Sequence, residues 1–195
     1  MNIVTEIKSQ YARVLQHSDW LQFKNVAEYY LETAARLKKK DIKSQSNKLL
    51  LRNSQKRLFI GIGSELLLKA FYLKNGYCIN KLNSSFSGKK LPVHKLSTLK
   101  KKDINKNNTF TLDPLVNHLK TISTLKSHKE IRHGFQIAMT FRNKEGHVTF
   151  PSHSFDIQNY RDIEKAIMLF YQEGFGEQLS YKISMQPHEK SRFAK

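Results

Sequence analysis

The longest apolar stretch of the chain runs from Leu58 to Leu73 and carries an acid and a base, Glu65 and Lys69, near its middle. A helix needs about 20 mostly apolar residues to cross a bilayer, so a stretch this short and this charged is not a membrane span. It is instead expected in a protein core. The apolar pattern around it predicts a helix from about Gln45 to Asn75 that ends at Gly76, a residue type suited to the left-handed position after a helix.

Two glycines, Gly61 and Gly63, lie inside this expected helix. Glycine in a helix interior is destabilising by about 1 kcal/mol relative to alanine. Either two helices meet there in a tight join, or one helix packs closely against its neighbours at the two glycines. The pair lacks the further glycine of a dinucleotide-binding loop, so no phosphate-binding loop is expected.

Apolar periodicity elsewhere predicts an all-α chain, folded as an up-and-down bundle of about five to six helices. At 195 residues one domain is the default, so residues 1–195 are interpreted as a single helical domain. Further helices are expected at about residues 3–14, 20–40, 113–125, 129–144 and 159–174. Two β-like runs, Val148–Phe150 and Tyr181–Met185, allow a small β-hairpin near the C-terminus.

Local signals refine two of these helices. Ser18-Asp19 is expected to cap the second helix, and Asp113 with Pro114 is expected to begin the fourth. The expected buried face of the second helix consists of Val26, Tyr29, Tyr30, Thr33, Ala34 and Leu37. The expected buried stripe of the fourth consists of Leu115, Val116, Leu119 and Ile122.

The chain is strongly basic: it has 34 Lys and Arg residues, 16 Asp and Glu residues and a formal net charge of +18. A surface of this sign is explained by a polyanionic partner, RNA in particular, or by an acidic protein. Chemistry on neutral small molecules does not require it. The alternative interpretation is a lysine-rich and asparagine-rich composition whose excess charge is ordinary solvated surface.

Residues 77–111 contain eight lysines and one acid, Asp103. The weak periodicity of this segment predicts a long, flexible, basic connection in which only Leu91–Leu96 and Leu99 are anchored. Basic residues at two places are candidates to contact the phosphates of RNA, with a solvated helix face as the alternative. They are Lys48, Arg52 and Lys56 at helical spacing, and Lys100, Lys101 and Lys102 in the connection.

Cys78 is the single cysteine, which excludes an intramolecular disulfide and any multi-cysteine metal site and fits a reducing cytoplasm. The first residues lack a basic segment followed by an apolar block, so no signal peptide is expected. The spacing of four histidines matches no standard zinc-ligand set: His128, His133, His147 and His153. Neither a metal nor a cofactor is therefore expected.

Arg142 and His147, separated by four residues, lie where the fifth helix is expected to end near Gly146. In a straight helix, residues five positions apart point about 140° away from each other around the axis. A left-handed Gly146 can end the helix and turn His147 back towards the Arg142 side.

Glu65 stands among isoleucines and leucines, which predicts a partly buried carboxylate that needs a cationic or hydrogen-bonding partner. Arg142 is the candidate partner. The alternative is an ordinary exposed pair between Glu65 and Lys69, four residues apart on one helix face.

Three short segments occur in this order: Glu65-Leu-Leu-Leu-Lys69-Ala70, then His94-Lys95-Leu96 with Leu99, then Arg142-Asn143-x-x-x-His147. They resemble the acidic core-helix motif, the short intervening segment and the catalytic arginine-histidine motif of the HEPN domains (higher eukaryotes and prokaryotes nucleotide-binding). The closest resemblance is to the ribonucleases of prokaryotic toxin-antitoxin and abortive-infection systems. The resemblance covers about residues 58–171. Gly146 departs from the family, which more often has a small helix-compatible residue there.

The resemblance implies a helical bundle that forms a homodimer, with two Arg-Asn-x-x-x-His segments facing each other across a cleft. It implies a metal-independent endoribonuclease, a cytoplasmic toxin or antiviral effector, that leaves 2′,3′-cyclic phosphate and 5′-hydroxyl ends. Arg142 would hold the phosphate, His147 would transfer protons and Asn143 would orient the histidine or the ribose. Glu65 and Lys69 would support them. The implied partners are RNA, a second copy of the chain and an acidic antitoxin protein, with no membrane involved.

Two other hypotheses stay open. If Gly146 displaces His147, the same fold is a non-catalytic module that binds RNA or a protein partner. The chain could also be the antitoxin or regulator itself, although the expected helices contain no helix-turn-helix signature.

Overall fold

The computed structural model describes residues 3–7, 9–10, 19–37, 48–92, 94–122, 124–147 and 157–183, without the side chains of residues 48–50 and 145–147. These parts are mostly α-helical, with one small antiparallel sheet of two strands. The predicted all-α bundle with a small hairpin is therefore confirmed as a fold class. None of the described helices is long and apolar enough to cross a membrane.

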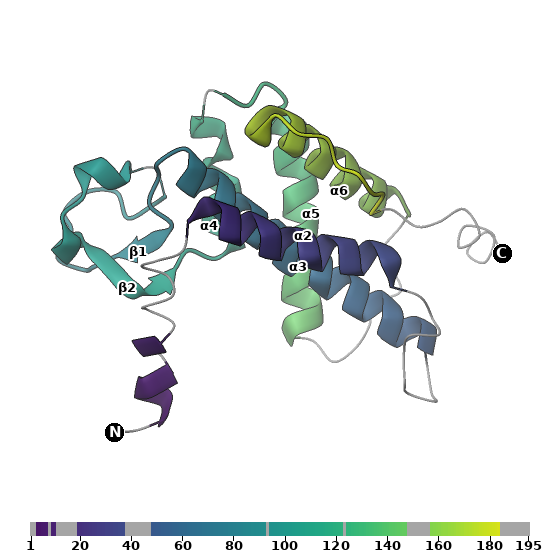
Figure 1. Cartoon of the computed structure of the whole chain (residues 1–195), viewed down its shortest axis with the longest axis horizontal. Coiled ribbons are helices and arrows are strands. Elements are labelled where there is room, and N and C mark those ends of the chain that lie inside the picture. Colours follow the sequence, from purple (N-terminus) through teal and green to yellow (C-terminus); the bar gives the residue numbers. More distant parts are fainter. Residues whose placement is uncertain are drawn as a thin grey trace.

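After a short N-terminal helix, the helices and strands follow in this order: α2 Trp20–Arg36, α3 Lys48–Lys74, β1 Asn80–Leu82, β2 Ile104–Thr109, α4 Leu112–His118, α5 His128–His147 and α6 Ile157–Phe170. The helices form the body of the molecule, with α2 alongside α3, α5 crossing α3 steeply and α6 lying against α5 (Figure 1). The two strands belong to a lobe at one side of this body.

Helix α3 is continuous over 27 residues, so close packing and not a join accounts for its two glycines. A Cβ atom on Gly63 would lie 2.7 Å from Leu31 Cγ of α2. A Cβ atom on Gly61 would overlap Arg142 Cβ of α5. Because glycine has no side chain, α2 and α5 both approach the backbone of α3 at these points.

Helix α2 begins as predicted, because the Asp19 side chain accepts a hydrogen bond of 2.9 Å from the Gln22 backbone N–H. Its predicted buried face is only partly correct. Ala34 is buried, Tyr30, Thr33 and Leu37 are half-buried, and Val26 and Tyr29 are 47% and 66% exposed. The buried residues are Lys24, Ala27, Leu31 and Ala34. The face of α2 that meets Gly63 of α3 consists of the Leu31 side chain and the backbone at Ala27, so it is shifted from the predicted one.

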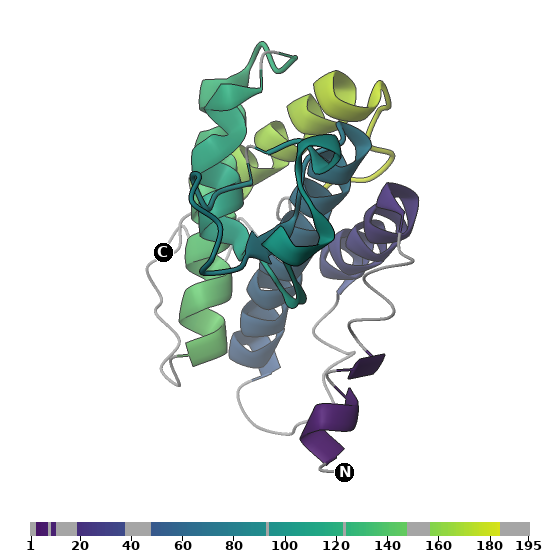
Figure 2. The ribbon, with the colours of Figure 1, turned by 90° about the vertical axis from the view of Figure 1, so that its left-hand side faces the viewer.

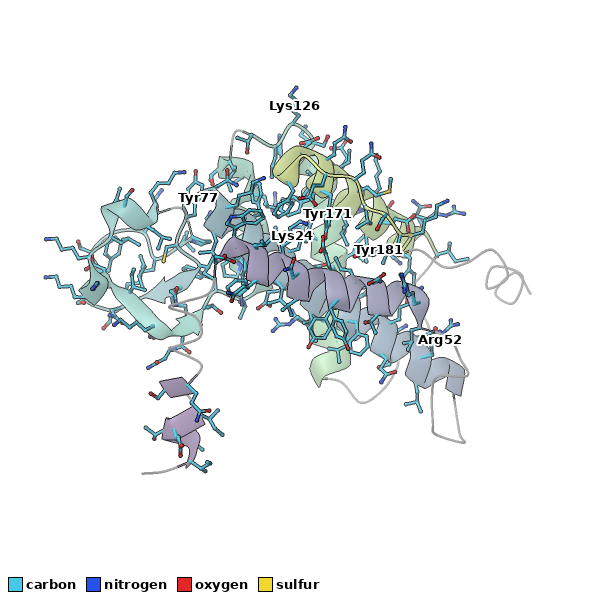
Figure 3. The ribbon with its side chains drawn as sticks, viewed as in Figure 1. Lys24, Arg52, Tyr77, Lys126, Tyr171 and Tyr181 are labelled. Atoms are coloured by element: carbon cyan, nitrogen blue, oxygen red, sulfur yellow. The ribbon has the colours of Figure 1, made fainter. Side chains whose placement is uncertain are left out.

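The charged member of that buried face, Lys24, joins α2 to the C-terminal part of the described chain. Its Nζ atom lies 2.9 Å from Glu28 and 2.7 Å from Glu177. Tyr171 donates a hydrogen bond of 3.1 Å to Glu28. Figure 3 shows Lys24, Tyr171 and Tyr181 together between α2 and α6.

Helices α4, α5 and α6 differ from their predicted bounds at their ends. Helix α4 has Thr111 at its N-cap position, without a side-chain capping hydrogen bond, and Asp113 lies inside its first turn. The helix gives way to a 3₁₀ turn at Leu119–Thr121. Its predicted stripe is buried as expected. Helix α6 continues into a π-helical turn, Tyr171–Phe175. Aromatic rings hold the end of α6 in the core, with Phe170 ring centroids 4.8 Å from Phe71 and 5.1 Å from Phe135.

The segment 77–111 is a folded lobe, not the flexible connection that its composition predicts. Strand β1 pairs antiparallel with β2, and buried apolar side chains anchor both strands. These side chains are Cys78, Ile79, Leu82 and Phe110. Strand β2 reads Ile-Asn-Lys-Asn-Asn-Thr and lacks the alternation of apolar and polar residues that marks a strand in a sequence. We call residues 77–111 the basic lobe.

The sheet therefore lies in the middle of the chain and not near the C-terminus. Tyr181–Ile183 form no strand. The other run expected in the hairpin, Val148–Phe150, lies outside the described residues. Figure 2 shows the basic lobe in front of the helices, extending from the C-terminal end of α3.

Candidate functional site

The Glu65 carboxylate of α3 is buried, with 8% of the residue exposed, and it contacts two cations. Lys69 Nζ donates a hydrogen bond of 2.7 Å to Oε1, and Arg142 Nη1 lies 2.8 Å from Oε2. No described group makes an aligned hydrogen bond to Oε2, so Arg142 acts on it mainly through charge. The predicted buried carboxylate with Arg142 as its partner is confirmed, and the exposed pair is excluded.

Helix spacing and a glycine bring these three residues together. Glu65 and Lys69 are four residues apart on α3 and so share one face. Gly61 lies one turn before Glu65 on that face, where it admits the backbone of α5 at Ala138 and Arg142. The arginine side chain then needs to extend only one turn along α3 to meet the carboxylate.

The basic lobe completes the cluster through Thr109, the last residue of β2. Lys69 Nζ donates a second hydrogen bond, of 2.9 Å, to Thr109 Oγ1. Thr109 is not among the predicted site residues, because it lies 40 positions from Lys69 in a segment expected to be flexible. No local signal marks it. The contact ties the lobe to the same buried carboxylate that holds Arg142.

The cluster contains two cations for one carboxylate. Glu65 and Lys69 are almost fully covered, whereas 33% of the Arg142 side chain is exposed. The cluster therefore has one surplus positive charge, and the part of it that meets solvent is the guanidinium. The guanidinium has five N–H donors in a planar fork, so it can hold Glu65 and also bind a phosphate.

The other two residues of the Arg142-Asn143-x-x-x-His147 segment follow on the last turns of α5. Asn143 is exposed. Helix α5 continues through Gly146 to His147, so the predicted helix end that would turn the histidine back is wrong. On a regular helix the two motif positions differ by about 140° around the axis. The His147 side chain lies outside the described residues.

Two of the predicted RNA-contacting residues are buried and form no exposed basic track. Arg52 and Lys56 are 5% and 3% exposed. Arg52 donates a hydrogen bond of 2.8 Å to the side chain of Asn53, and Lys56 Nζ lies 5.8 Å from the ring centroid of Tyr160 on α6. Figure 3 shows Arg52 at the end of α3 opposite the basic lobe. The side chain of Lys48 lies outside the described residues.

The second predicted group, Lys100, Lys101 and Lys102, is exposed on the basic lobe. A 3₁₀ turn holds these lysines, because the Asp103 carboxylate accepts a hydrogen bond of 2.9 Å from the Lys100 backbone N–H. Their contact with RNA stays a prediction.

Within the described ranges, no three His, Cys, Asp or Glu side chains gather as metal ligands would. The thiol of Cys78 is buried, and burial raises its pKa. A buried thiol of raised pKa is a poor nucleophile, so Cys78 serves the core of the lobe.

Among the predicted site residues whose side chains the structure describes, those open to solvent are Arg142 in part, Asn143, and Lys100, Lys101 and Lys102. Arg142 and the lobe are joined through Glu65, Lys69 and Thr109. No protein-family model matches the chain, and no curated protein or solved structure matches it.

Proposed function

We propose that the chain is a metal-independent endoribonuclease in which Arg142 binds the scissile phosphate and His147 transfers protons. The observation that carries the proposal is the fixed position of Arg142: a buried carboxylate holds the guanidinium at 2.8 Å while a third of the side chain faces solvent. A preorganised cation of this kind stabilises negative charge that develops on a phosphate during cleavage.

RNA supplies its own nucleophile, the 2′-hydroxyl. Cleavage needs a base to take the proton of this hydroxyl, an acid to protonate the leaving 5′-oxygen, and positive charge on the phosphate. Imidazole titrates near neutral pH and serves as acid or base. In a homodimer, two copies of His147 divide these two tasks, and the products are a 2′,3′-cyclic phosphate and a 5′-hydroxyl.

The remaining residues of the cluster act on Arg142 and not on RNA. Glu65 is a positioning residue, because its charge holds the guanidinium 2.8 Å from the carboxylate. Lys69 neutralises Glu65 and leaves the charge of Arg142 available to the phosphate. Asn143 lies exposed beside Arg142 and orients the ribose or the histidine.

A ribonuclease that acts on the cell's own RNA must be restrained. The formal charge of +18 makes an acidic protein the natural inhibitor, since it competes with RNA for the same basic surface. This fits the part of a toxin or abortive-infection effector, with an acidic antitoxin as the partner.

A second candidate function is a non-catalytic RNA-binding module. Helix α5 stays helical through Gly146, and this observation favours it. Positions 142 and 147 then differ by about 140° around the helix axis, a spacing that does not favour the action of both residues of one protomer on one phosphate. The enzyme requires the histidine of the second protomer to meet that phosphate.

The test is an incubation of the purified protein with total cellular RNA in EDTA, beside the variants Arg142→Ala and His147→Ala. Wild-type protein should cut the RNA and leave 2′,3′-cyclic phosphate ends. Both variants should lose cleavage by about a hundredfold or more, since each removes a group that acts in the transition state. Lys126→Gln, an exposed change far from the site, is the control for contaminating ribonuclease and should cut like wild type.

Intact RNA in every lane, with binding retained, would establish the non-catalytic module instead. The mass in solution tests the dimer separately: a protomer has 22.8 kDa, and sedimentation should give twice that value.

A further inference from the structure

The basic lobe presents all eight of its lysines to solvent. They are Lys81, Lys89, Lys90, Lys95, Lys100, Lys101, Lys102 and Lys106. With Asp103 as the single acid of the segment, the lobe has a formal charge of +7, a large share of the +18 of the whole chain. The lobe is therefore more densely charged than the rest of the chain, which carries the remaining +11 (18 − 7) over many more residues.

Acidic side chains do not neutralise this charge. None of the ion pairs between described residues includes a lobe lysine. The one carboxylate, that of Asp103, accepts the Lys100 backbone N–H and so closes a turn. The field of the lobe also reaches a neighbouring group, because Lys89 and Lys120 add to the effect of burial in lowering the pKa of His118.

None of the aromatic rings described in the lobe is fully exposed, and Tyr77 and Phe86 are half-buried. Phe110 is buried. The ring of Tyr77 is covered by Lys95 Nζ, 4.0 Å from its centroid, and Phe86 packs against His94 in an edge-to-face contact. Proteins that bind single strands combine basic grooves with exposed aromatic platforms, whereas double-helical RNA is recognised mainly through its backbone and shape. Lysines without a fully exposed aromatic ring favour the double helix.

The lobe is fixed to the body, so its lysines keep a constant position relative to Arg142. Backbone hydrogen bonds of 2.8 Å join Tyr77 to Tyr72 and Leu96 to Gly76. The hydrogen bond between Lys69 and Thr109 joins the far end of β2 to the Glu65 cluster. In Figure 2 the lobe stands directly in front of the helices that hold this cluster.

We propose that the basic lobe binds the phosphate backbone of double-helical RNA and places one strand of that helix at Arg142. The choice of RNA over DNA rests on the ribonuclease function proposed above. The preference for a double helix rests on the lobe itself.

Binding is best measured with His147→Ala protein, which does not cleave, and three probes of equal length. The probes are an RNA duplex of about 20 base pairs, one of its strands alone and the DNA duplex of the same sequence. The RNA duplex should bind most tightly. Its affinity should fall steeply with salt, because lysines that contact phosphates release bound counterions.

The decisive variant changes Lys100, Lys101 and Lys102 to glutamine. If all three contact phosphates, the slope of log affinity against log salt should fall by about two to three units, and the affinity near 0.15 M salt should fall about 10- to 100-fold. The matched control changes three exposed lysines of the body to glutamine and should match the unmodified protein. These are Lys126, Lys129 and Lys165. Circular dichroism checks that both triple variants fold.

Equal binding by the lobe variant and the control variant would overturn the proposal, as would a single strand that binds as tightly as the duplex. A DNA duplex that binds more tightly than the RNA duplex would overturn the choice of RNA.

Cleavage separates this proposal from the one before it. If wild-type protein fails to cut RNA but the lobe variant still loses duplex binding, the enzyme function fails and the lobe proposal stands. If the lobe variant cuts structured RNA as fast as wild type at 0.15 M salt, the lobe proposal fails.

Discussion

The cations at the N-terminal end of helix α3 differ in exposure from those of the basic lobe that follows its C-terminal end. At the N-terminal end Arg52 and Lys56 are buried and contact protein groups, whereas the lysines of the basic lobe at the C-terminal end are exposed. Both groups look alike in the sequence, as clusters of positive charge. Their difference shows that the number of basic residues does not identify a nucleic-acid surface, because a cation can equally serve packing when its stem is covered and its head has partners.

The position of each group explains the difference. Arg52 and Lys56 lie on a helix that other helices cover, and their spacing of four residues keeps them on one face. Lys56 reaches the ring of Tyr160 on α6. The lobe projects from the body and is too small to cover long side chains, so its lysines extend into water. Four measurements test this comparison, from the largest expected effect to the smallest.

The largest effect on stability is expected for a substitution of Glu65, which lies on α3 between the two regions. Glu65→Ala leaves Lys69 covered without a counter-charge and should lower the free energy of unfolding by about 3 kcal/mol, the lower end of the range for a broken buried pair because Arg142 keeps contact with solvent. Urea unfolding measures it. Glu6→Ala, at an exposed acid, is the control and should change stability by no more than about 0.5 kcal/mol. A similar loss of unfolding free energy in both variants would contradict the stabilising role of the buried Glu65 carboxylate.

The next effect contrasts one cation from each region. Lys56→Ala removes a covered stem and a cation over an aromatic ring, so it should destabilise the protein by about 2 kcal/mol and leave the salt dependence of RNA binding unchanged. Lys101→Ala should do the reverse: stability stays within about 0.5 kcal/mol, and the salt slope falls by about one unit. The comparison fails if Lys56→Ala alters the slope and Lys101→Ala does not.

A smaller effect is expected where the lobe meets the cluster. Thr109→Val removes the acceptor of the Lys69 hydrogen bond and should cost about 1 kcal/mol in urea unfolding, since the threonine is partly open to water. Cleavage should slow in parallel, because the lobe loses one of its attachments beside Arg142. Thr124→Val, an exposed position outside the lobe, serves as the matched change and should have neither effect. Full activity in Thr109→Val would show that the attachment is not needed.

The smallest effect concerns His118, which senses the charge of the lobe. Burial first, and then Lys120 and Lys89, lower the pKa of this histidine below its ordinary value of 6.5. The unfolded chain then binds more protons than the folded one, so stability should fall as the pH drops below about 6.5 towards the lowered pKa. In an NMR titration Lys89→Gln should raise the pKa of His118, while Lys129→Gln should not. If the pKa of His118 is unchanged in both variants, the charge of Lys89 has no effect on this histidine.

Sequence reasoning recovered the parts of this fold and site that depend on one helix at a time. An acid inside an apolar helix must be neutralised, and this requirement alone pointed to Glu65 and its cationic partner. The preference of glycine for a left-handed conformation placed the end of α3 at Gly76, whose φ is 72°. Capping chemistry placed the start of α2 at Asp19.

What sequence reasoning missed depends on contacts between distant segments. The buried face of α2 includes Ala27 and Leu31 because α3 presents Gly63 there, and no pattern within α2 reveals its neighbour. Thr109 becomes part of the site only because β2 ends beside Lys69. The lobe itself is held by a few buried apolar side chains spread over a segment whose composition is otherwise typical of a loop.

If this site cleaves RNA through the RNA's own 2′-hydroxyl, one pair of substrates shows it most directly. A folded RNA is incubated with wild-type protein in EDTA, once with all ribose and once with a single 2′-deoxyribose on the 5′ side of the mapped cleavage position. We expect a 2′,3′-cyclic phosphate end from the all-ribose RNA and no cut at that position in the RNA with the 2′-deoxyribose. Cleavage of both, or of neither, would contradict this mechanism.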